Sequence, residues 1–223
     1  MASVVKLLMS EFVTHDVKRF ILEKPKGFSF VPGQGVMIAI NTPEMQDEFR
    51  PFSPTSLNED SVLEFIIKEY QEHHGVTEKL HKLRSGDELL VEEAFGTIQY
   101  RGPGVFIAGG AGITPFLSIM RELKKTEKLA GNMLLFSNRT KADIILEQEL
   151  QHYLADKSVF TLTHQNFTGY KNGFIDKAFI ERTVSVLNQP FYLCGPPPFM
   201  TAITQVLQDL GVKRENLILE GFE

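Results

Sequence analysis

The sequence of 223 residues predicts two domains of different classes, an antiparallel β domain followed by an α/β domain with a parallel sheet. Short segments of β-branched or alternating residues, separated by Pro and Gly turns, fill the first part of the chain. Strand-like and helix-like segments then alternate to the end. A turn at 101–104 separates the two patterns, so we expect one domain in residues 1–101 and another in residues 102–223.

The first domain is expected to consist mainly of strands. The predicted strands are VVKLL (4–8), VKRFILE (17–23), GVMIAI (35–40), VLEFIIKEY (62–70) and DELLVEE (87–93). One helix is predicted between them, at about Thr77–Leu83. Short strands at this spacing favour an antiparallel barrel or sandwich.

The second domain is expected to alternate strands with helices. Its predicted strands are VFIA (105–108), MLLF (133–136), SVFTLT (158–163), FYLC (191–194) and LILE (217–220). Helices are predicted at Pro115–Leu123, from Asp143, near Asp176 and from about Pro198, with Gly211 ending the last one. Continuous apolar strands joined by helices indicate a parallel sheet covered on both faces.

Composition excludes several classes of protein. Hydrophobic residues make up 43% of the chain and the formal net charge is -5, which is ordinary for a globular protein and unlike a nucleic-acid binder. The single cysteine, Cys194, excludes an internal disulfide and a thiolate iron–sulfur cluster, so we expect a reducing, cytoplasmic setting. No segment approaches the roughly 20 apolar residues of a membrane span, and the apolar run at the start is too short for a signal peptide.

The histidines give no sign of a metal site or a hydrolase. His73 and His74 are adjacent, with no Cys or acidic partner at the spacing of metal ligands, so we expect no metal. His15, His152 and His164 lack the neighbours of a catalytic triad.

AGGAGITP (108–115) lies where a predicted strand leads into a helix. Its glycines leave the backbone open to a ligand, while Thr114 and Pro115 suit the first positions of a helix. Free N–H groups there favour an anion such as a pyrophosphate. The spacing differs from the Rossmann G-x-G-x-x-G, and a tight β–α turn without a ligand would look the same.

CGPPPFM (194–200) forms a second junction between a strand and a helix. Ligands of open α/β sheets lie outside the carboxyl ends of the strands, so Cys194 is expected to face the same crevice as Thr114. The alternative is a buried structural cysteine followed by a rigid proline turn.

RPFSPTS (50–56) lacks the apolar alternation of a strand and is predicted to be a loop with binding chemistry. Arg50 offers a planar fork for phosphate oxygens, Phe52 a ring for stacking, and Ser53 a hydroxyl. HHGVT (73–77) precedes the predicted helix, whose amides suit a second phosphate. An ordinary surface loop is the alternative for the first segment, and surface histidines for the second.

In this order, the motifs RPFS, HGVT, GGAGITP and CGPPPFM resemble those of the ferredoxin–NADP reductase superfamily over essentially the whole chain. FSNRTKADIILEQEL and CGPPPFM are similar to the cytochrome b5 reductase and oxygenase-reductase branches. The resemblance implies an antiparallel Greek-key β-barrel that binds FAD, followed by an α/β domain that binds NAD(P)H.

The resemblance also implies roles for residues of the first domain. Arg50 would hold the FAD pyrophosphate, Phe52 the isoalloxazine face, where relatives usually have Tyr, and Ser53 would lie near flavin N5, with Pro51 also in this cofactor-binding segment. The further residues it assigns to FAD are Ile67 and Lys68 through their backbone, Val76 and Thr77 at a second phosphate turn, and Phe222 as a terminal aromatic over the flavin.

For the second domain, the resemblance implies a nucleotide site at two junctions. The residues are Gly110, Gly112 and Thr114 in the nucleotide loop, and Cys194, Gly195 and Pro196 beside the nicotinamide. Ser53, Thr114 and Cys194 would shape the hydride transfer, and none of them needs to be a strong acid or base.

The implied activity is transfer of hydride from NAD(P)H to FAD, then of electrons to a separate acceptor such as a ferredoxin or flavodoxin. Lys79, Lys82 and Arg84 would form a docking patch for such an acidic partner, or simply a solvated helix face. A flavin reductase that releases reduced flavin and a non-catalytic FAD- or nucleotide-binding sensor are the alternatives.

The choice of coenzyme is predicted from the segment after the strand at 133–136. Ser137 and Arg139 could bind the 2′-phosphate of NADPH, and the segment 137–142 contains no acidic residue before Asp143. This slightly favours NADPH over NADH, although an exposed Arg139 without a ligand is the alternative.

Overall fold

The computed structural model describes residues 2–70, 75–96 and 98–219. The chain forms two compact units. The first contains Met1–Gln99 together with Thr114–Glu122, and the second contains Tyr100–Ile113 together with Leu123–Glu223.

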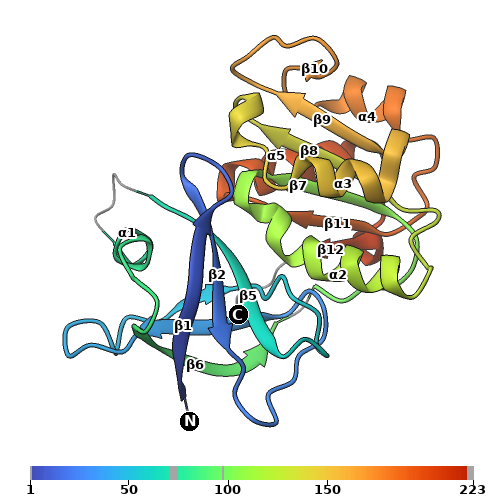
Figure 1. Ribbon diagram of the computed structural model, residues 1–223. Helices are drawn as coiled ribbons and strands as arrows, with labels where there is room; N and C mark the ends of the chain where they lie inside the picture. Colours follow the sequence, from blue (N-terminus) through green and yellow to red (C-terminus); the bar gives the residue numbers. More distant parts are fainter. Residues whose placement is uncertain (1, 71–74, 97, 220–223) are drawn as a thin grey trace. The chain divides into compact units, whose positions relative to one another are not determined.

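The first unit is built on an antiparallel sheet (Figure 1). Its strands lie in the order β4-β3-β6-β1-β2-β5, and Pro54, just after β4, forms a bridge with Phe65 of β5, which joins the two ends of that order. This confirms the predicted antiparallel Greek-key β-barrel. The strands are β1 (Ser3–Phe12), β2 (Val17–Glu23), β3 (Gly35–Ile40), β4 (Arg50–Phe52), β5 (Val62–Lys68) and β6 (Glu88–Phe95).

Alternation of side chains explains the barrel core. Phe20 and Leu22 of β2 and Leu63 and Phe65 of β5 are buried, while the residues between them are less buried. Successive side chains of a strand point to opposite faces, so this pattern gives the sheet one apolar face. The predicted helix is α1 (Val76–His81), whose Val76 packs in the same core.

One expectation in this unit was wrong, because Arg50–Phe52 forms strand β4 rather than a loop. It pairs antiparallel with Val36–Ile38 of β3. Arg50 and Pro51 are exposed, so this short strand at the end of the strand order needs no apolar alternation. A proline is tolerated there because its missing N–H costs no ladder bond on the open side.

The second unit has a parallel sheet, as predicted (Figure 1). The strand order is β10-β9-β8-β7-β11-β12. The strands are β7 (Val105–Gly109), β8 (Met133–Asn138), β9 (Ser158–Leu162), β10 (Lys171–Asn172), β11 (Phe191–Cys194) and β12 (Leu217–Leu219). The helices of this unit are α3 (Glu147–Leu154), α4 (Lys177–Thr183) and α5 (Pro197–Asp209), while α2 (Thr114–Lys125) belongs mostly to the first unit.

Both faces of the parallel sheet are apolar. On one face, Ile107, Leu135 and Leu193 share a core with Phe179 of α4 and Ile203 of α5. On the other, the rings of Tyr100, Phe106 and Tyr192 stack. The continuous apolar strands of the sequence therefore have the expected physical cause.

The helix predicted from Asp143 begins later, at Glu147. Asp143 instead ends a 3-10 turn, where its carboxylate accepts hydrogen bonds from the backbone N–H and the hydroxyl of Thr140, each at 2.7 Å. Leu146 then adopts a left-handed conformation with φ of 50°, which separates this turn from α3. The apolar spacing was correctly assigned to a helix, but the acidic residue caps a different turn.

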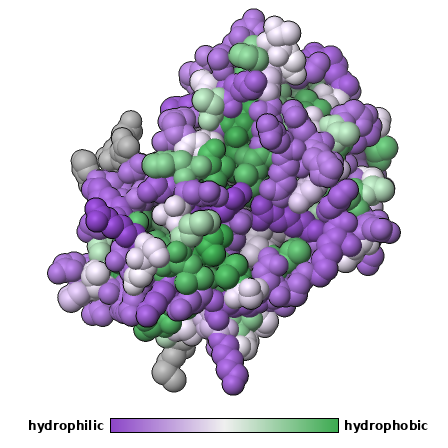
Figure 2. Space-filling model, in the orientation of Figure 1, coloured by the Kyte–Doolittle hydropathy of each residue, from purple (hydrophilic) through white to green (hydrophobic). Residues whose placement is uncertain are grey.

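Among the described residues, strand β1 carries a row of exposed apolar side chains. Val4, Leu8, Met9 and Phe12 are exposed on this strand. Figure 2 shows hydrophobic residues interrupting the hydrophilic surface on this face of the molecule. Among the described residues, no helix is long and apolar enough to cross a membrane.

Candidate functional site

The carboxyl ends of β7 and β11 lie side by side and carry the two predicted nucleotide motifs. Ile107 pairs with Leu193, and Ala108 pairs with Cys194. Strand β7 lies between β8, which follows it in sequence, and β11, so the strand order reverses at this point. Ligands of open α/β sheets bind at such a reversal, outside the carboxyl ends of the strands.

The two predicted glycines of the first motif are required for different reasons. Gly110 has φ of +52°, a left-handed conformation, and an added Cβ would have no heavy atom within 4 Å, so its backbone is open on that side. At Gly112 a Cβ would lie 2.2 Å from the carbonyl oxygen of Cys194. Gly112 therefore has to be glycine for packing against the second motif, whether or not a ligand is present.

The second motif contributes a buried cysteine and a helix start. Cys194 ends β11 with 7% of its surface exposed, and Pro196 is the N-cap residue of α5. Cys194, Gly195 and Pro197 line a pocket of about 520 Å³. The other residues around it are Met200, Thr201, Thr204, Gln205, Gln208 and Leu219.

Thr114 is the first residue of α2, directly after a 3-10 turn at Gly110–Ile113. The chain therefore enters helical geometry at Gly110, before the predicted start at Pro115. Thr114 belongs to the first unit, whereas Gly110 and Gly112 belong to the second.

The end of β8 holds buried polar groups that suit a ligand. Asn138 is 5% exposed, and neither its amide nitrogen nor its amide oxygen has a hydrogen-bond partner among the described residues. Ser137 is also buried, whereas Arg139 is exposed just beyond the strand. Asp143 lies near Arg139 along the folded chain, since its carboxylate is bonded to Thr140. Sequence reasoning missed Asn138, because a polar residue at a strand end does not reveal that it is unpaired.

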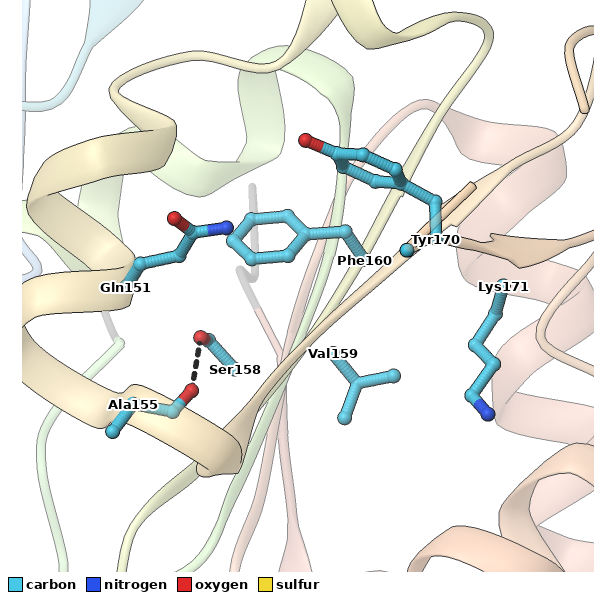
Figure 3. Close-up of a pocket in the computed structure, with 8 residues that line it drawn as sticks. Gln151, Ala155, Ser158, Val159, Phe160, Tyr170 and Lys171 are labelled. Carbon is cyan, nitrogen blue, oxygen red and sulfur yellow. Dashed lines mark hydrogen bonds between the residues drawn. The ribbon is translucent and has the colours of Figure 1, made fainter. Parts of the chain in front are cut away.

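A second pocket, of about 410 Å³, lies beside β9 (Figure 3). Figure 3 shows Phe160, Tyr170 and the amide of Gln151 close together, and Lys171 pointing away from them. Tyr170 donates a hydrogen bond to Glu147, and burial together with this carboxylate raises the pKa of Tyr170 to about 12. None of the residues predicted for a site from the sequence lines this pocket.

In the first unit, Arg50 lies on the exposed strand β4. Its guanidinium donates hydrogen bonds to the carbonyl of Phe49 at 2.7 Å and to Glu48 at 3.0 Å. Half of the side chain is exposed, at 50%. A guanidinium has five N–H donors, so donors remain for an anion.

The residues next to Arg50 become progressively more buried. Pro51 is exposed, Phe52 is half-buried against the barrel core, and Ser53 is 7% exposed. A ring packed on one side and open on the other is suited to stacking against a flat ligand.

Ile67 and Lys68 lie at the end of β5, with Ile67 buried. The carbonyl of Ile67 faces Nε2 of His81 at 2.8 Å. The ammonium of Lys68 lies 2.7 Å from Asp16; burial opposes the charge of Asp16, but this contact lowers its pKa overall.

Val76 and Thr77 begin α1, whose N-cap is Gly75. The hydroxyl of Thr77 accepts a hydrogen bond from the N–H of Tyr70 at 3.3 Å. His81 at the other end of α1 is 6% exposed, and burial lowers its pKa. Sequence reasoning gave no role to His81, because its partner Ile67 is a backbone group on another element.

Two further predictions concern the cover of the flavin and the docking patch. Phe222, the proposed cover of the flavin, lies outside the described residues, as do His73 and His74. In the predicted docking patch, Lys82 is exposed but paired with Glu78 at 2.5 Å, and Lys79 contacts the sulfur of Met45 at 2.9 Å.

Comparison with protein families identifies both halves of the chain. Residues 4–100 match the family described as "Oxidoreductase FAD-binding domain", and residues 106–205 match "Oxidoreductase NAD-binding domain". The chain is 28% identical over 221 residues to the ferredoxin–NAD(P)(+) reductase component of the naphthalene 1,2-dioxygenase system of Pseudomonas putida, covering 95% of this chain and 66% of that protein. It is 28% identical over 229 residues to NADH–cytochrome b5 reductase 1 of Arabidopsis thaliana, covering 94% and 80%.

Solved structures agree with the fold. The cytochrome b5 reductase domain of Ulva prolifera nitrate reductase has a TM-score of 0.83 and 26% identity, covering 98% of this chain and 97% of that one. A Neisseria gonorrhoeae ferredoxin NADP+ reductase with bound FAD and NADP has a TM-score of 0.85 at 20% identity, covering 98% of both chains, which supports the fold alone. With its FAD-binding and NAD-binding domains in this order, the chain belongs to the ferredoxin–NADP reductase superfamily.

Proposed function

We propose that this chain is an NAD(P)H-dependent flavoenzyme that takes a hydride from NAD(P)H and delivers electrons to a separate acceptor. The observation that carries the proposal is the presence of one FAD-binding and one NAD-binding oxidoreductase domain in a single chain. Bound FAD would supply the redox chemistry, accepting a hydride and releasing electrons singly.

The residues of the first unit fit FAD chemically. Arg50 has a half-exposed guanidinium with donors to spare, which suits the pyrophosphate. Phe52 presents a ring supported by the core, and Ser53 follows it as a buried hydroxyl. We propose that Arg50 holds the phosphate end, that Phe52 stacks on the isoalloxazine and that Ser53 lies near flavin N5, with Pro51 contacting the cofactor between them.

Other residues of this unit would complete the FAD site. We propose that the backbone of Ile67 and Lys68 lies along the cofactor, and that Val76 and Thr77 offer N–H groups at the start of α1 to a second phosphate edge. We also propose that Phe222 covers the flavin face.

The second unit fits a nicotinamide dinucleotide. The open backbone at Gly110 and the adjoining end of β11 suit a pyrophosphate and nicotinamide. The unpaired amide of buried Asn138 supports a ligand at the end of β8. We propose contacts from Gly110, Gly112, Thr114, Cys194, Gly195 and Pro196, and from Ser137 and Arg139 at the adenosine end.

The role of these residues is to bind and orient. Because Cys194 and Ser53 are buried, they would help exclude water from the reacting atoms. No strong acid or base is needed for transfer of a hydride, so Ser53, Cys194 and Thr114 would contribute through placement.

For the acceptor, we propose a small acidic redox protein of the ferredoxin or flavodoxin type. Support comes from the exposed Lys82 and Arg84, although Glu78 neutralises part of this charge. Electron transfer that falls with ionic strength and with Lys82→Glu would support docking here, whereas transfer independent of salt would contradict it.

Anaerobic titration with NADH and NADPH tests the function. The purified protein should be yellow and should bleach within seconds. A yellow protein that neither coenzyme bleaches would be a sensor instead of a reductase. Loss of FAD on gel filtration, with turnover of added FMN, would instead indicate a flavin reductase.

A further inference from the structure

Arg121 of α2 contacts the segment that follows the proposed flavin residues. Its Nη1 atom donates hydrogen bonds to the carbonyl of Thr55 and to a carboxylate oxygen of Glu64, each at 2.6 Å. The hydroxyl of Thr55 donates to that same oxygen of Glu64 at 2.7 Å. Arg121, Glu64 and Thr55 therefore form one connected cluster within the first unit.

The charges in this cluster are largely removed from water. The side chains of Arg121 and Glu64 are each 15% exposed. The other carboxylate oxygen of Glu64 lies 3.3 Å from Nε of Arg19, so Glu64 stands between two cations. Loss of one partner from such a pair leaves a desolvated charge, which makes the contact sensitive to substitution.

The cluster also fixes the backbone just after Phe52 and Ser53. The N–H of Thr55 donates to the carbonyl of Glu64 at 2.7 Å, and the N–H of Glu64 donates to the hydroxyl of Ser56 at 3.1 Å. These bonds fix the backbone of residues 53–56 against β5.

Helix α2 is held to the barrel at a second point, nearer its start. The N–H of Gly33 donates to the hydroxyl of Ser118 at 3.2 Å, and an added Cβ at Gly33 would lie 3.0 Å from the side chain of Ile119. Because α2 begins at Thr114, these contacts hold the first turns of α2 against the barrel within the first unit.

We propose that Arg121 is a positioning residue for hydride transfer. Through Glu64 and Thr55 it holds Ser53 in a fixed place relative to Thr114, the first residue of its own helix. This inference rests on the proposed function and adds a residue outside both predicted sites. Rates of transfer are sensitive to displacements of about 1 Å, so a distant contact of this kind can control them.

The test compares Arg121→Ala and Arg121→Lys with a control on the same helix, Lys124→Ala, whose side chain is exposed. Each FAD-loaded protein is mixed anaerobically with NADH or NADPH in a stopped-flow instrument. Arg121→Ala should lower the limiting reduction rate about tenfold, with the apparent Kd for the nicotinamide coenzyme changed less than about twofold and FAD content unchanged. Arg121→Lys keeps the charge but loses the planar fork, so its limiting reduction rate should lie between those of Arg121→Ala and wild type.

A second measurement does not depend on activity. Hydrogen exchange of the Thr55 amide should be about tenfold faster in Arg121→Ala than in wild type, and unchanged in Lys124→Ala. A normal limiting rate, or normal Thr55 exchange, in Arg121→Ala would overturn the proposal. A change in the apparent Kd and FAD content alone would indicate only a structural role. If wild type is not reduced at all, the proposed function fails, while the exchange result still decides whether Arg121 fixes Thr55.

Discussion

The two predicted binding regions differ in the groups that are proposed to contact the ligand. On β4 in the first unit, the proposed FAD contacts are side chains, and Arg50 is half exposed and held by its neighbours Glu48 and Phe49. At the ends of β7 and β11 in the second unit, the proposed contacts are mainly backbone groups, and Gly112 is packed directly against Cys194. Substitution should therefore affect ligand affinity in the first region and folding in the second.

The largest effect is expected at Gly112. An added side chain would meet backbone atoms of Cys194 and Gly195, which cannot move aside easily. Gly112→Ala should lower the free energy of unfolding by about 3 kcal/mol or more, at or above the upper end of the usual cost of overpacking, measured by urea denaturation. Gly110→Ala is the matched control, since it has open space and only the strain of a positive φ. Equal stability of Gly112→Ala and wild type would remove the contrast between the regions.

At Arg50 the expected loss is in affinity. Arg50→Ala should weaken FAD binding by about 1.5–3 kcal/mol, the scale of hydrogen bonds to a charged group, with little change in unfolding of the apoprotein. Fluorescence titration with FAD measures this, and Arg84→Ala, another exposed arginine of the same unit, is the control. Wild-type affinity in Arg50→Ala would show that Arg50 is a surface residue.

The pH dependence of stability should report on His81. Burial lowers its pKa in the folded state from an ordinary value of 6.5, although the carbonyl of Ile67 and the nearby Glu69 oppose this, and Lys18 assists it. The unfolded chain therefore binds the proton first, so His81 lowers stability as pH falls below about 6.5, by at most about 1.4 kcal/mol per pH unit. His81→Gln keeps an N–H donor without titrating.

Urea denaturation between pH 5 and pH 7 should consequently give a shallower pH dependence for His81→Gln than for wild type. The titration of Asp16, whose folded pKa is also lowered, is common to both proteins and cancels in the comparison. Parallel curves would indicate that the folded protein does not keep His81 neutral.

The smallest effect is expected at the adenosine end of the nucleotide site, where the exposed, charged side chain of Arg139 is proposed to bind. Arg139→Ala should raise KM for NADPH several-fold and leave KM for NADH nearly unchanged. Asp143 lies close by through its bonds to Thr140, and an acid in this place favours the 2′-hydroxyl of NADH. Equal effects on both coenzymes, or a wild-type kcat/KM strongly favouring NADH, would contradict the role of Arg139.

The fold class could be predicted from the sequence, because it depends on local periodicity. Alternation in VKRFILE and continuous apolar runs such as VFIA correctly separated an antiparallel sheet from a parallel one. The helix predicted from about Pro198 is α5, and Gly211, with φ of +82°, follows its end as expected. The motifs also located the two junctions where β7 and β11 end.

Which polar and charged groups pair could not be predicted from the sequence, because those contacts join residues that are distant along the chain. Arg50–Phe52 forms a strand because it pairs with β3, and Asp143 caps a 3-10 turn instead of starting α3. Glu64 and Arg121 are 57 positions apart, and no local pattern indicates that their charges meet. Likewise, Gly112 has to be glycine because of the backbone of Cys194 and Gly195, which lie more than 80 positions later in the sequence, beyond what a local pattern could reveal.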